Sequence, residues 1–224
     1  NKMVMDEQVA FAAIDFLIKH SHGRRNLEMD FFGGEPLMNL DVVKSTVEYA
    51  RSLESKHGKV FRFTMTTNGM LLDDAVSEYL NGEMSNVVLS LDGRKHINDQ
   101  MRPNAGGSGS YDKIVPKYKH FVDIRGQKDY YVRGTFTNQN IDFSKDVLHM
   151  AELGFDQISV EPAVCHSDLP YSITQQHLPA IFKEYDKLAT IMLDKKKAGK
   201  GFKLNFSASA FQFRANLAGF VLGN

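Results

Sequence analysis

Short apolar segments alternate along this chain with longer segments in which apolar residues recur at helical spacing. The short segments are rich in β-branched and aromatic residues and end at turn-forming residues, a pattern typical of strands. They cover residues 27–32, 60–66, 87–91, 130–136, 157–161 and 202–206. Each interval between them carries apolar positions three and four residues apart, which predicts a helix.

The helices predicted at the two ends of this pattern are the best defined. An amphipathic segment at about residues 6–19 precedes the first strand, and Asp6 is a suitable N-cap because its carboxylate can accept an amide hydrogen of the first turn. The longest apolar stripe comprises Ile181, Phe182, Tyr185, Leu188 and Met192. Gly154 falls where the helix before it should end.

Strands that alternate with helices predict an α/β fold with parallel pairing through right-handed crossovers. Two architectures fit this pattern, a (β/α) barrel or partial barrel and an open doubly wound sheet. In both, functional residues gather in the loops that follow the C-terminal ends of the strands. The unusual polar residues of this chain do follow its predicted strands.

Composition excludes several classes of protein. Lys and Arg number 27 and Asp and Glu number 27, so the chain lacks the basic excess of a general nucleic-acid binder. Cys165 is the single cysteine, which excludes a disulfide scaffold and any metal site built from several cysteines of this chain. No apolar run approaches the roughly 20 residues of a membrane helix. Without a signal peptide at its start, the chain is expected in the cytoplasm, with neither nucleic acid nor membrane as partner.

The first predicted strand leads into Phe32-Gly33-Gly34-Glu35-Pro36. Two glycines allow a ligand to approach the backbone closely, and Glu35 adds a negative charge beside their carbonyl groups. This combination suits a primary ammonium group. A tight turn with a solvated glutamate is the alternative interpretation.

Polar residues also follow the second and third predicted strands. Thr67-Asn68-Gly69 can orient a ligand or form an Asx turn. Ser90 and Asp92 lie two positions apart, so on one continuous strand they would face the same way and could bind hydroxyl or amino-acid groups. A merely polar strand end remains possible for this pair.

Arg133 lies in the middle of the fourth predicted strand. A guanidinium buried in a sheet needs a carboxylate, which either a ligand or the protein supplies, and Glu161 on the next strand is the candidate within the chain. An acid for an ammonium, an arginine for a carboxylate and hydroxyl-binding groups together complement an amino acid joined to a sugar. The eight histidines show no zinc-ligand spacing, so no metal site is predicted.

Three of these motifs resemble a known family. Phe32-Gly33-Gly34-Glu35-Pro36, Thr67-Asn68-Gly69 and Ser90-Leu91-Asp92-Gly93 resemble the radical S-adenosylmethionine (SAM) enzymes of the SPASM subgroup. Residues 30–39, 86–103 and 109–164 are similar to one branch, the maturases of six-cysteine-in-forty-five-residue (SCIFF) peptides. The resemblance covers roughly residues 5–203 and includes Arg133-Gly134-Thr135-Phe136-Thr137.

The resemblance implies roles for individual residues. Gly33, Gly34 and Glu35 would hold the SAM ammonium, and Arg133 its carboxylate. The same resemblance adds several further contacts. The additional pocket residues that it implies are Ser90, Asn68 and Asp92. The segment after Glu161 would contact adenine, and Arg102 would face the peptide.

The resemblance also implies a fold, an activity and partners. The fold is a partial TIM-like (β/α) barrel, and the activity is reductive cleavage of SAM to a 5′-deoxyadenosyl radical followed by thioether formation between a cysteine sulfur and an α-carbon. The substrate would be a ribosomally made, cysteine-rich precursor peptide, and flavodoxin or ferredoxin would donate the electron. The [4Fe–4S] ligands, a Cys-x₃-Cys-x₂-Cys loop, and the first barrel strand are expected upstream, and auxiliary [4Fe–4S] clusters are expected downstream.

Residues 1–206 are therefore predicted as a partial radical SAM core, and residues 207–224 as a divergent or truncated tail. Because the iron ligands are missing from these residues, the chain alone is expected to be inactive. Two alternatives remain. One is a peptide-binding relative without a cluster, and the other is an ordinary TIM-barrel lyase or isomerase that uses Glu35 or Asp92 as an acid or base.

Overall fold

The computed structural model describes residues 4–199 and 201–205, arranged in two compact units. The first unit comprises residues 4–89 together with 120–130, and the second comprises 90–119 together with 131–199 and 201–205. The predicted tail, 207–224, lies outside the described residues. No helix among the described residues is both long and apolar enough to cross a membrane.

The first unit is built on parallel strands in chain order. Strand β1 (Asn26–Phe31) pairs in parallel with β2 (Val60–Thr67), and β2 pairs in parallel with β3 (Asn86–Ser90). The other elements of this unit are α1 (Glu7–His20), the 3₁₀ helix η1 (Pro36–Asn39), α2 (Leu40–His57) and α3 (Asp74–Glu83). Alternate residues of β2 are buried, because one of its faces packs into the core of the unit.

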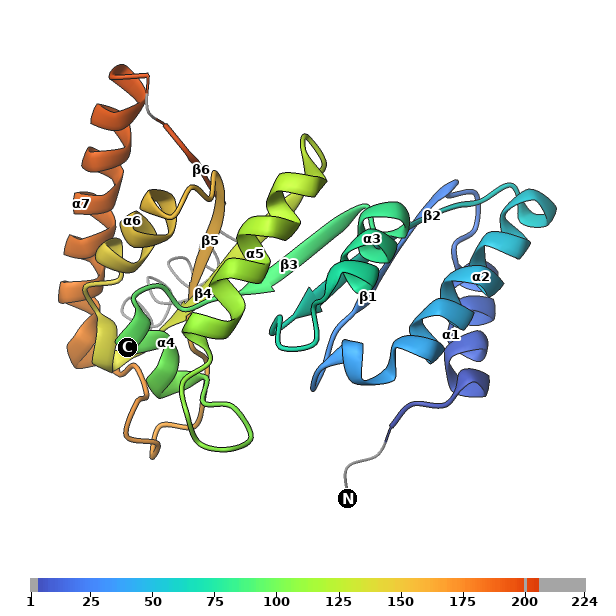
Figure 1. Ribbon diagram of the computed structural model, residues 1–224, viewed down its shortest axis with the longest axis horizontal. Helices are drawn as coiled ribbons and strands as arrows, with labels where there is room; N and C mark the ends of the chain where they lie inside the picture. The colour runs from blue at the N-terminus through green and yellow to red at the C-terminus, as the bar shows by residue number, and fades with distance from the viewer. Residues whose placement is uncertain (1–3, 200, 206–224) are drawn as a thin grey trace, which may run out of the picture. The chain divides into compact units, whose positions relative to one another are not determined.

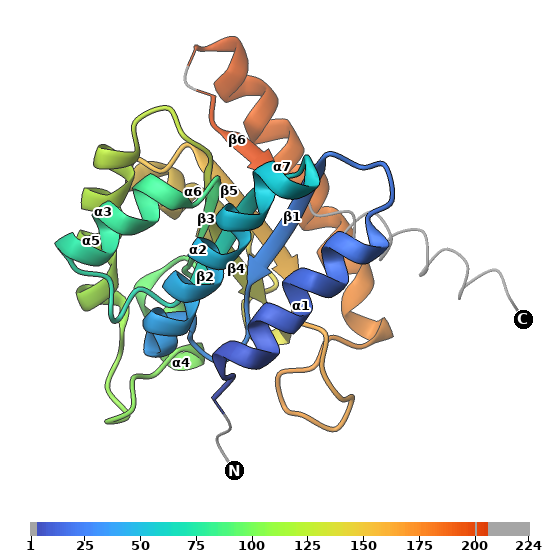
Figure 2. The ribbon, with the colours of Figure 1, turned by 90° about the vertical axis from the view of Figure 1, so that its right-hand side faces the viewer.

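Helices α1 and α2 run side by side in both views (Figures 1 and 2). The ring of Phe11 stacks on that of Tyr49 with 4.3 Å between centroids, and the Tyr49 hydroxyl donates to Asp15 at 2.9 Å. The N-terminus of α1 is capped as predicted, since Asp6 accepts the Val9 amide hydrogen at 2.9 Å.

The second unit also orders its strands along the chain. Strand β4 (Tyr130–Phe136) pairs in parallel with β5 (Gln157–Pro162), and β5 pairs in parallel with β6 (Lys203–Asn205). Its other elements are α4 (Lys95–Met101), α5 (Tyr111–Arg125, whose last turns belong to the first unit), η2 (Asn138–Asn140), α6 (Ser144–Glu152), η3 (Gln175–His177) and α7 (Leu178–Lys197).

Aromatic side chains fill the core of the second unit. The rings of Phe136 and Phe143 stack at 4.3 Å between centroids, and Tyr185 of α7 tilts against Phe143 at 4.8 Å. Helix α6 therefore packs against α7, which Figure 1 shows beside it. Burial raises the pKa of Tyr185 to about 12, with a smaller contribution from the negative charge of Glu161.

The α/β class is confirmed, and all six predicted strands are present, each with ends within one residue of the prediction. One helix was not predicted, and one prediction was wrong in detail. Residues 95–101 form helix α4, which was not among the predicted elements. Strand β3 ends at Ser90, so Asp92 lies beyond it, and the assumption that both residues share one strand face does not apply. Gly93, directly after Asp92, has a φ of +104°, which does not occur in a regular strand.

Candidate functional site

In the first unit, the turn after β1 carries the Gly-Gly-Glu-Pro motif. Gly33 has a φ of +115°, which only glycine adopts readily, and neither Gly33 nor Gly34 has another atom within 4 Å of the place where a Cβ would be. Both glycines are exposed. The backbone of this turn is therefore open to close approach by a ligand, as the sequence predicted.

Glu35 ties this turn to the end of β2. Its Oε1 accepts from the Leu37 amide at 3.1 Å and from the Thr67 hydroxyl at 2.9 Å, and its Oε2 accepts from the Asn68 amide at 2.7 Å. The carboxylate also caps η1, where Pro36 takes the first helical position. An ionised carboxylate can accept about four hydrogen bonds, so three protein donors leave room for one more.

Asn68 forms an Asx turn, one of the two interpretations that the sequence left open for this motif. Its Oδ1 accepts from the Met70 amide at 3.0 Å, and the Thr67 hydroxyl accepts from the Gly69 amide at 3.0 Å. These bonds fix the end of β2, where the backbone amide of Asn68 donates to Glu35. The two motifs that sequence reasoning treated separately form one hydrogen-bonded corner in the first unit.

In the second unit, Asp92 is buried and fully hydrogen bonded, with 1% of its side chain exposed. Its Oδ2 accepts from Arg102 Nε at 2.8 Å, and its Oδ1 accepts from Arg102 Nη2 at 3.0 Å, so the two side chains form a bidentate pair. Oδ1 also accepts from the Thr135 amide at 2.8 Å and from the Thr135 hydroxyl at 3.0 Å. Ser90 is buried as well, and its carbonyl accepts from the Tyr118 hydroxyl at 3.0 Å.

Arg133 forms an ion pair with Glu161, the partner that the sequence offered. In the parallel register Arg133 lies opposite Ser159, and Glu161 lies opposite Thr135, so the guanidinium reaches two residues along the sheet toward the strand ends. The Arg133 side chain keeps 39% of its surface exposed, against 11% for Glu161. One guanidinium nitrogen, Nη2, serves Glu161, and a guanidinium carries five N–H donors in all, which leaves capacity for a second carboxylate.

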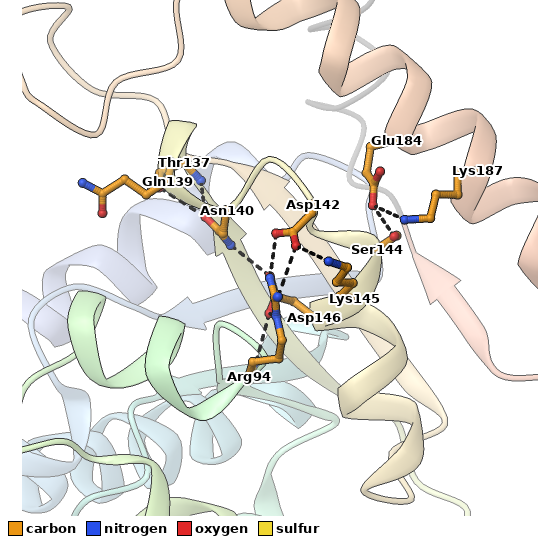
Figure 3. Close-up of polar contacts among 10 residues, drawn as sticks. All are labelled: Arg94, Thr137, Gln139, Asn140, Asp142, Ser144, Lys145, Asp146, Glu184 and Lys187. Atoms are coloured by element: carbon orange, nitrogen blue, oxygen red, sulfur yellow. Dashed lines mark hydrogen bonds and ion pairs between the residues drawn. The ribbon is translucent and has the colours of Figure 1, made fainter.

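A further ionic cluster was missed by the sequence reasoning (Figure 3). Arg94, directly after the Ser90–Gly93 motif, donates through Nε to Asp146 at 2.7 Å and through Nη2 to Asp142 at 2.7 Å. Asp146 also accepts from the Arg94 amide at 3.0 Å and from Asn140 at 3.1 Å. The Arg94 hydrogen bond is the main cause that lowers the pKa of Asp142. The alternating charges around residues 142–146 are the only sequence signal of this cluster. No pattern near Arg94 indicates that it pairs with them.

The described residues contain no group of three or more His, Cys, Asp and Glu side chains placed to hold a metal ion. Cys165 follows β5 and its Sγ lies 3.2 Å from the Ser172 hydroxyl. With one cysteine in its 224 residues, the chain cannot supply three thiolates to an iron–sulfur cluster. Ligands for a cluster would therefore have to come from outside these residues.

Comparisons with known proteins agree with the motifs. A family model described as "4Fe-4S single cluster domain" matches residues 2–116, just over half of the chain. An uncharacterized protein of Methanocaldococcus jannaschii is 30% identical over 163 residues, which are 72% of this chain and 54% of that protein. The cysteine-type anaerobic sulfatase-maturating enzyme of Clostridium novyi is 28% identical over 100 residues, covering 44% of this chain and 26% of the enzyme.

Solved structures share the fold. The structure of anSMEcpe with bound AdoMet and the Kp18Cys peptide superposes with a TM-score of 0.78 at 18% identity, over 100% of this chain and 60% of that one. SuiB of Streptococcus suis, bound to S-adenosylmethionine, gives a TM-score of 0.58 at 16% identity, over 92% of this chain and 44% of that one.

The chain spans about half the length of the archaeal relative and about 60% of the anSMEcpe chain. Nothing in these comparisons singles out the thioether-forming branch, so that assignment stays a prediction. The family match agrees with the motifs at the ends of β1, β2 and β3. The chain therefore belongs to the 4Fe-4S single cluster domain family, and the membership in the radical SAM proteins that its Gly-Gly-Glu-Pro motif indicated is confirmed.

Proposed function

We propose that the protein containing this chain is a radical SAM enzyme that modifies a peptide. The observation that carries the proposal is the open Gly33-Gly34 turn, held by Glu35 against the end of β2 in a chain of this family. The sulfatase-maturating relatives and the AdoMet- and peptide-bound anSMEcpe structure support both the cofactor and the substrate class.

In the first unit, the proposed role of the Gly-Gly-Glu turn is to bind the SAM ammonium. The remaining acceptor position of Glu35 and the carbonyl groups of the exposed residues Gly33 and Gly34 would each accept one of its hydrogens. Three protein donors already fix the Glu35 carboxylate, so it is preorganised and loses little side-chain freedom on binding. Asn68 supports this corner through its amide.

In the second unit, the proposed role of Arg133 is to bind the SAM carboxylate with the donors that Glu161 leaves free. Glu161 would then hold the guanidinium in place between two carboxylates. Ser90, buried at the end of β3, is the proposed additional contact.

The cluster that SAM requires would be held by three cysteines from outside these 224 residues. Together, the reduced cluster and SAM supply a 5′-deoxyadenosyl radical, which abstracts hydrogen from the substrate. We propose the narrower activity that the resemblance implies, formation of a thioether between a cysteine sulfur and an α-carbon of a ribosomally made, cysteine-rich precursor peptide. Per crosslink, the C–H hydrogen atom would go to the 5′-deoxyadenosyl radical, and the S–H hydrogen would leave as a proton with one electron, which the auxiliary clusters expected downstream would accept. Separately, a reducing protein such as flavodoxin or ferredoxin would supply the electron that cleaves SAM.

The test uses protein expressed from the complete open reading frame that encodes this chain, reconstituted anaerobically with iron and sulfide. We expect 5′-deoxyadenosine from SAM and a peptide product lighter by two hydrogen atoms per crosslink. A peptide with its cysteines replaced by serine should still support formation of 5′-deoxyadenosine but give no crosslink. Absence of 5′-deoxyadenosine with a full complement of cluster would refute the proposal.

A second candidate is the alternative that the sequence left open, a peptide-binding relative without a cluster. It predicts that the complete protein binds peptide with the same affinity in the presence and absence of SAM, and that no iron is retained after reconstitution. An isolated chain of residues 1–224 should form no 5′-deoxyadenosine under either proposal, because it lacks the thiolates.

A further inference from the structure

The chain directly after β3 lies against β4 in the second unit. The Leu91 amide donates to the Arg133 carbonyl at 2.9 Å. A Cβ on Gly134 would lie 2.7 Å from the Leu91 carbonyl oxygen, a distance that real Cβ atoms essentially never show, and 3.2 Å from the Asp92 Cα, which is tighter than most real contacts. The glycine between Arg133 and Thr135 is therefore what allows the two segments to meet.

At the next residue, the side chain of Asp92, and not its backbone, forms the hydrogen bonds to β4. Its Oδ1 accepts both the amide and the hydroxyl of Thr135, at 2.8 and 3.0 Å. The carboxylate is buried and negatively charged, so it needs a cation, and Arg102 supplies one through two parallel hydrogen bonds. Arg102 is itself fixed at the end of α4, where its amide donates to the Asn98 carbonyl at 2.7 Å.

All the acceptor positions of the Asp92 carboxylate are used in this arrangement, since it receives four hydrogen bonds. It has no lone pair left for a ligand hydroxyl. Likewise, the guanidinium of Arg102 commits its Nε and Nη2 edge to Asp92, so one of its two bidentate edges is already occupied within the protein. Both residues are better suited to hold other residues in place than to contact SAM or peptide.

The residues that this pair holds are two proposed contacts of SAM. Ser90 comes two positions before Asp92, and Arg133 comes two positions before Thr135. We propose that Asp92 and Arg102 are positioning residues, which fix the spacing between Ser90 and Arg133 and thereby set the affinity for SAM. This inference rests on the proposed function, because it takes Ser90 and Arg133 as SAM contacts.

The test is a double-mutant cycle of Asp92→Asn and Arg102→Gln in the complete protein, read as the dissociation constant for SAM. A shared role predicts that each single variant weakens SAM binding roughly tenfold and that the double variant is no weaker than the poorer single one. Arg102→Lys, which keeps the charge but loses the planar fork, should recover only part of the affinity. Lys95→Gln, which removes the exposed Lys95–Asp112 pair on the same helix, is the matched control and should not change SAM binding.

A second measurement, made in the absence of SAM, reports on the contacts among Asp92, Arg102 and Thr135. Hydrogen exchange of the Thr135 amide should be faster in Arg102→Gln than in wild type and unchanged in Lys95→Gln, because Asp92 is its acceptor. Additive effects of the two substitutions on SAM binding would overturn the inference, as would an Arg102→Gln variant that raises only the KM for peptide. Wild-type protein that binds no SAM would instead overturn the proposed function, and the inference would fall with it.

Discussion

Oε2 of Glu35 accepts the backbone amide hydrogen of Asn68 at 2.7 Å, which joins the turn after β1 to the end of β2. One side chain thus serves the local fold and, in the proposed function, the ligand. Its effects on stability and on binding have different chemical causes, so substitutions can separate them.

Glu35→Gln should reduce both stability and SAM turnover. The amide of glutamine keeps one acceptor but places an NH₂ group against an N–H donor of the corner, at a cost of about 1–3 kcal/mol in the free energy of unfolding. Loss of the negative charge should also abolish turnover of SAM in the complete enzyme. Chemical denaturation and a 5′-deoxyadenosine assay check the two effects, and normal kinetics in this variant would remove Glu35 from the site.

Arg133→Ala should abolish SAM turnover, because the proposed partner of the SAM carboxylate is lost. It should also lower the free energy of unfolding by about 2 kcal/mol, since Glu161 would remain largely buried without its cation, although partial exposure of Arg133 reduces the effect. Adding Glu161→Gln should restore stability but not turnover. Arg62→Ala, in the exposed Arg62–Glu28 pair, is the control that should leave both unchanged. Turnover that recovers together with stability would assign Arg133 a purely structural role.

Gly93→Ala should destabilise the protein strongly. Its Cβ would lie 2.2 Å from the Asp146 Cβ, and its φ of +104° is unfavourable for any side chain. Gly82→Ala is the matched control, because this exposed helical glycine has open space around it, and alanine should there stabilise by roughly 0.5–1 kcal/mol. Thermal unfolding of the two variants should therefore shift in opposite directions. A Gly93→Ala variant as stable as wild type would show that the contact with Asp146 relaxes easily.

The Arg94 cluster should make stability depend on pH in acid. Because Arg94 lowers the pKa of Asp142 below 3.8 in the folded protein, the ionised carboxylate stabilises the fold above that pH. The contribution should decline as the pH falls through the folded pKa. Asp142→Asn should therefore cost about 1 kcal/mol near neutral pH, a modest value for a half-exposed group, and the difference from wild type should close as the pH falls through the lowered pKa of Asp142. A difference that stays constant from pH 7 to about pH 2 would exclude this linkage.

Local pattern was sufficient to predict the strands and the position of Arg133 within β4, since β-branched residues and turn signals are local properties. The partner Glu161 could also be inferred, because a buried guanidinium requires a carboxylate and the next strand offers one. Helix α4 was missed because its Asn98 and Asp99 are typical of turns. In the structure the Asn98 side chain is buried and bonded to the Asp92 amide and to Ser110, contacts that local pattern does not reveal.

The Arg94–Asp146 and Asp92–Thr135 contacts were missed for a related reason. They join residues 52 and 43 positions apart, and nothing in the periodicity of either segment indicates the other. Sequence reasoning placed Asp92 near a ligand because it follows a strand end. The role of the residue depends on what lies opposite that end, which only the fold determines.

The diagonal pairing of Arg133 with Glu161 has a consequence for how the length of this region can change. Strand faces alternate with each residue, so deleting one residue within β5 ahead of Glu161 would turn its carboxylate to the opposite face and leave an aliphatic side chain beside the guanidinium. Insertions in the connection between β4 and β5 do not change which residues of β5 face Arg133. Natural length variation among homologous chains should therefore concentrate in that connection and spare the strands themselves.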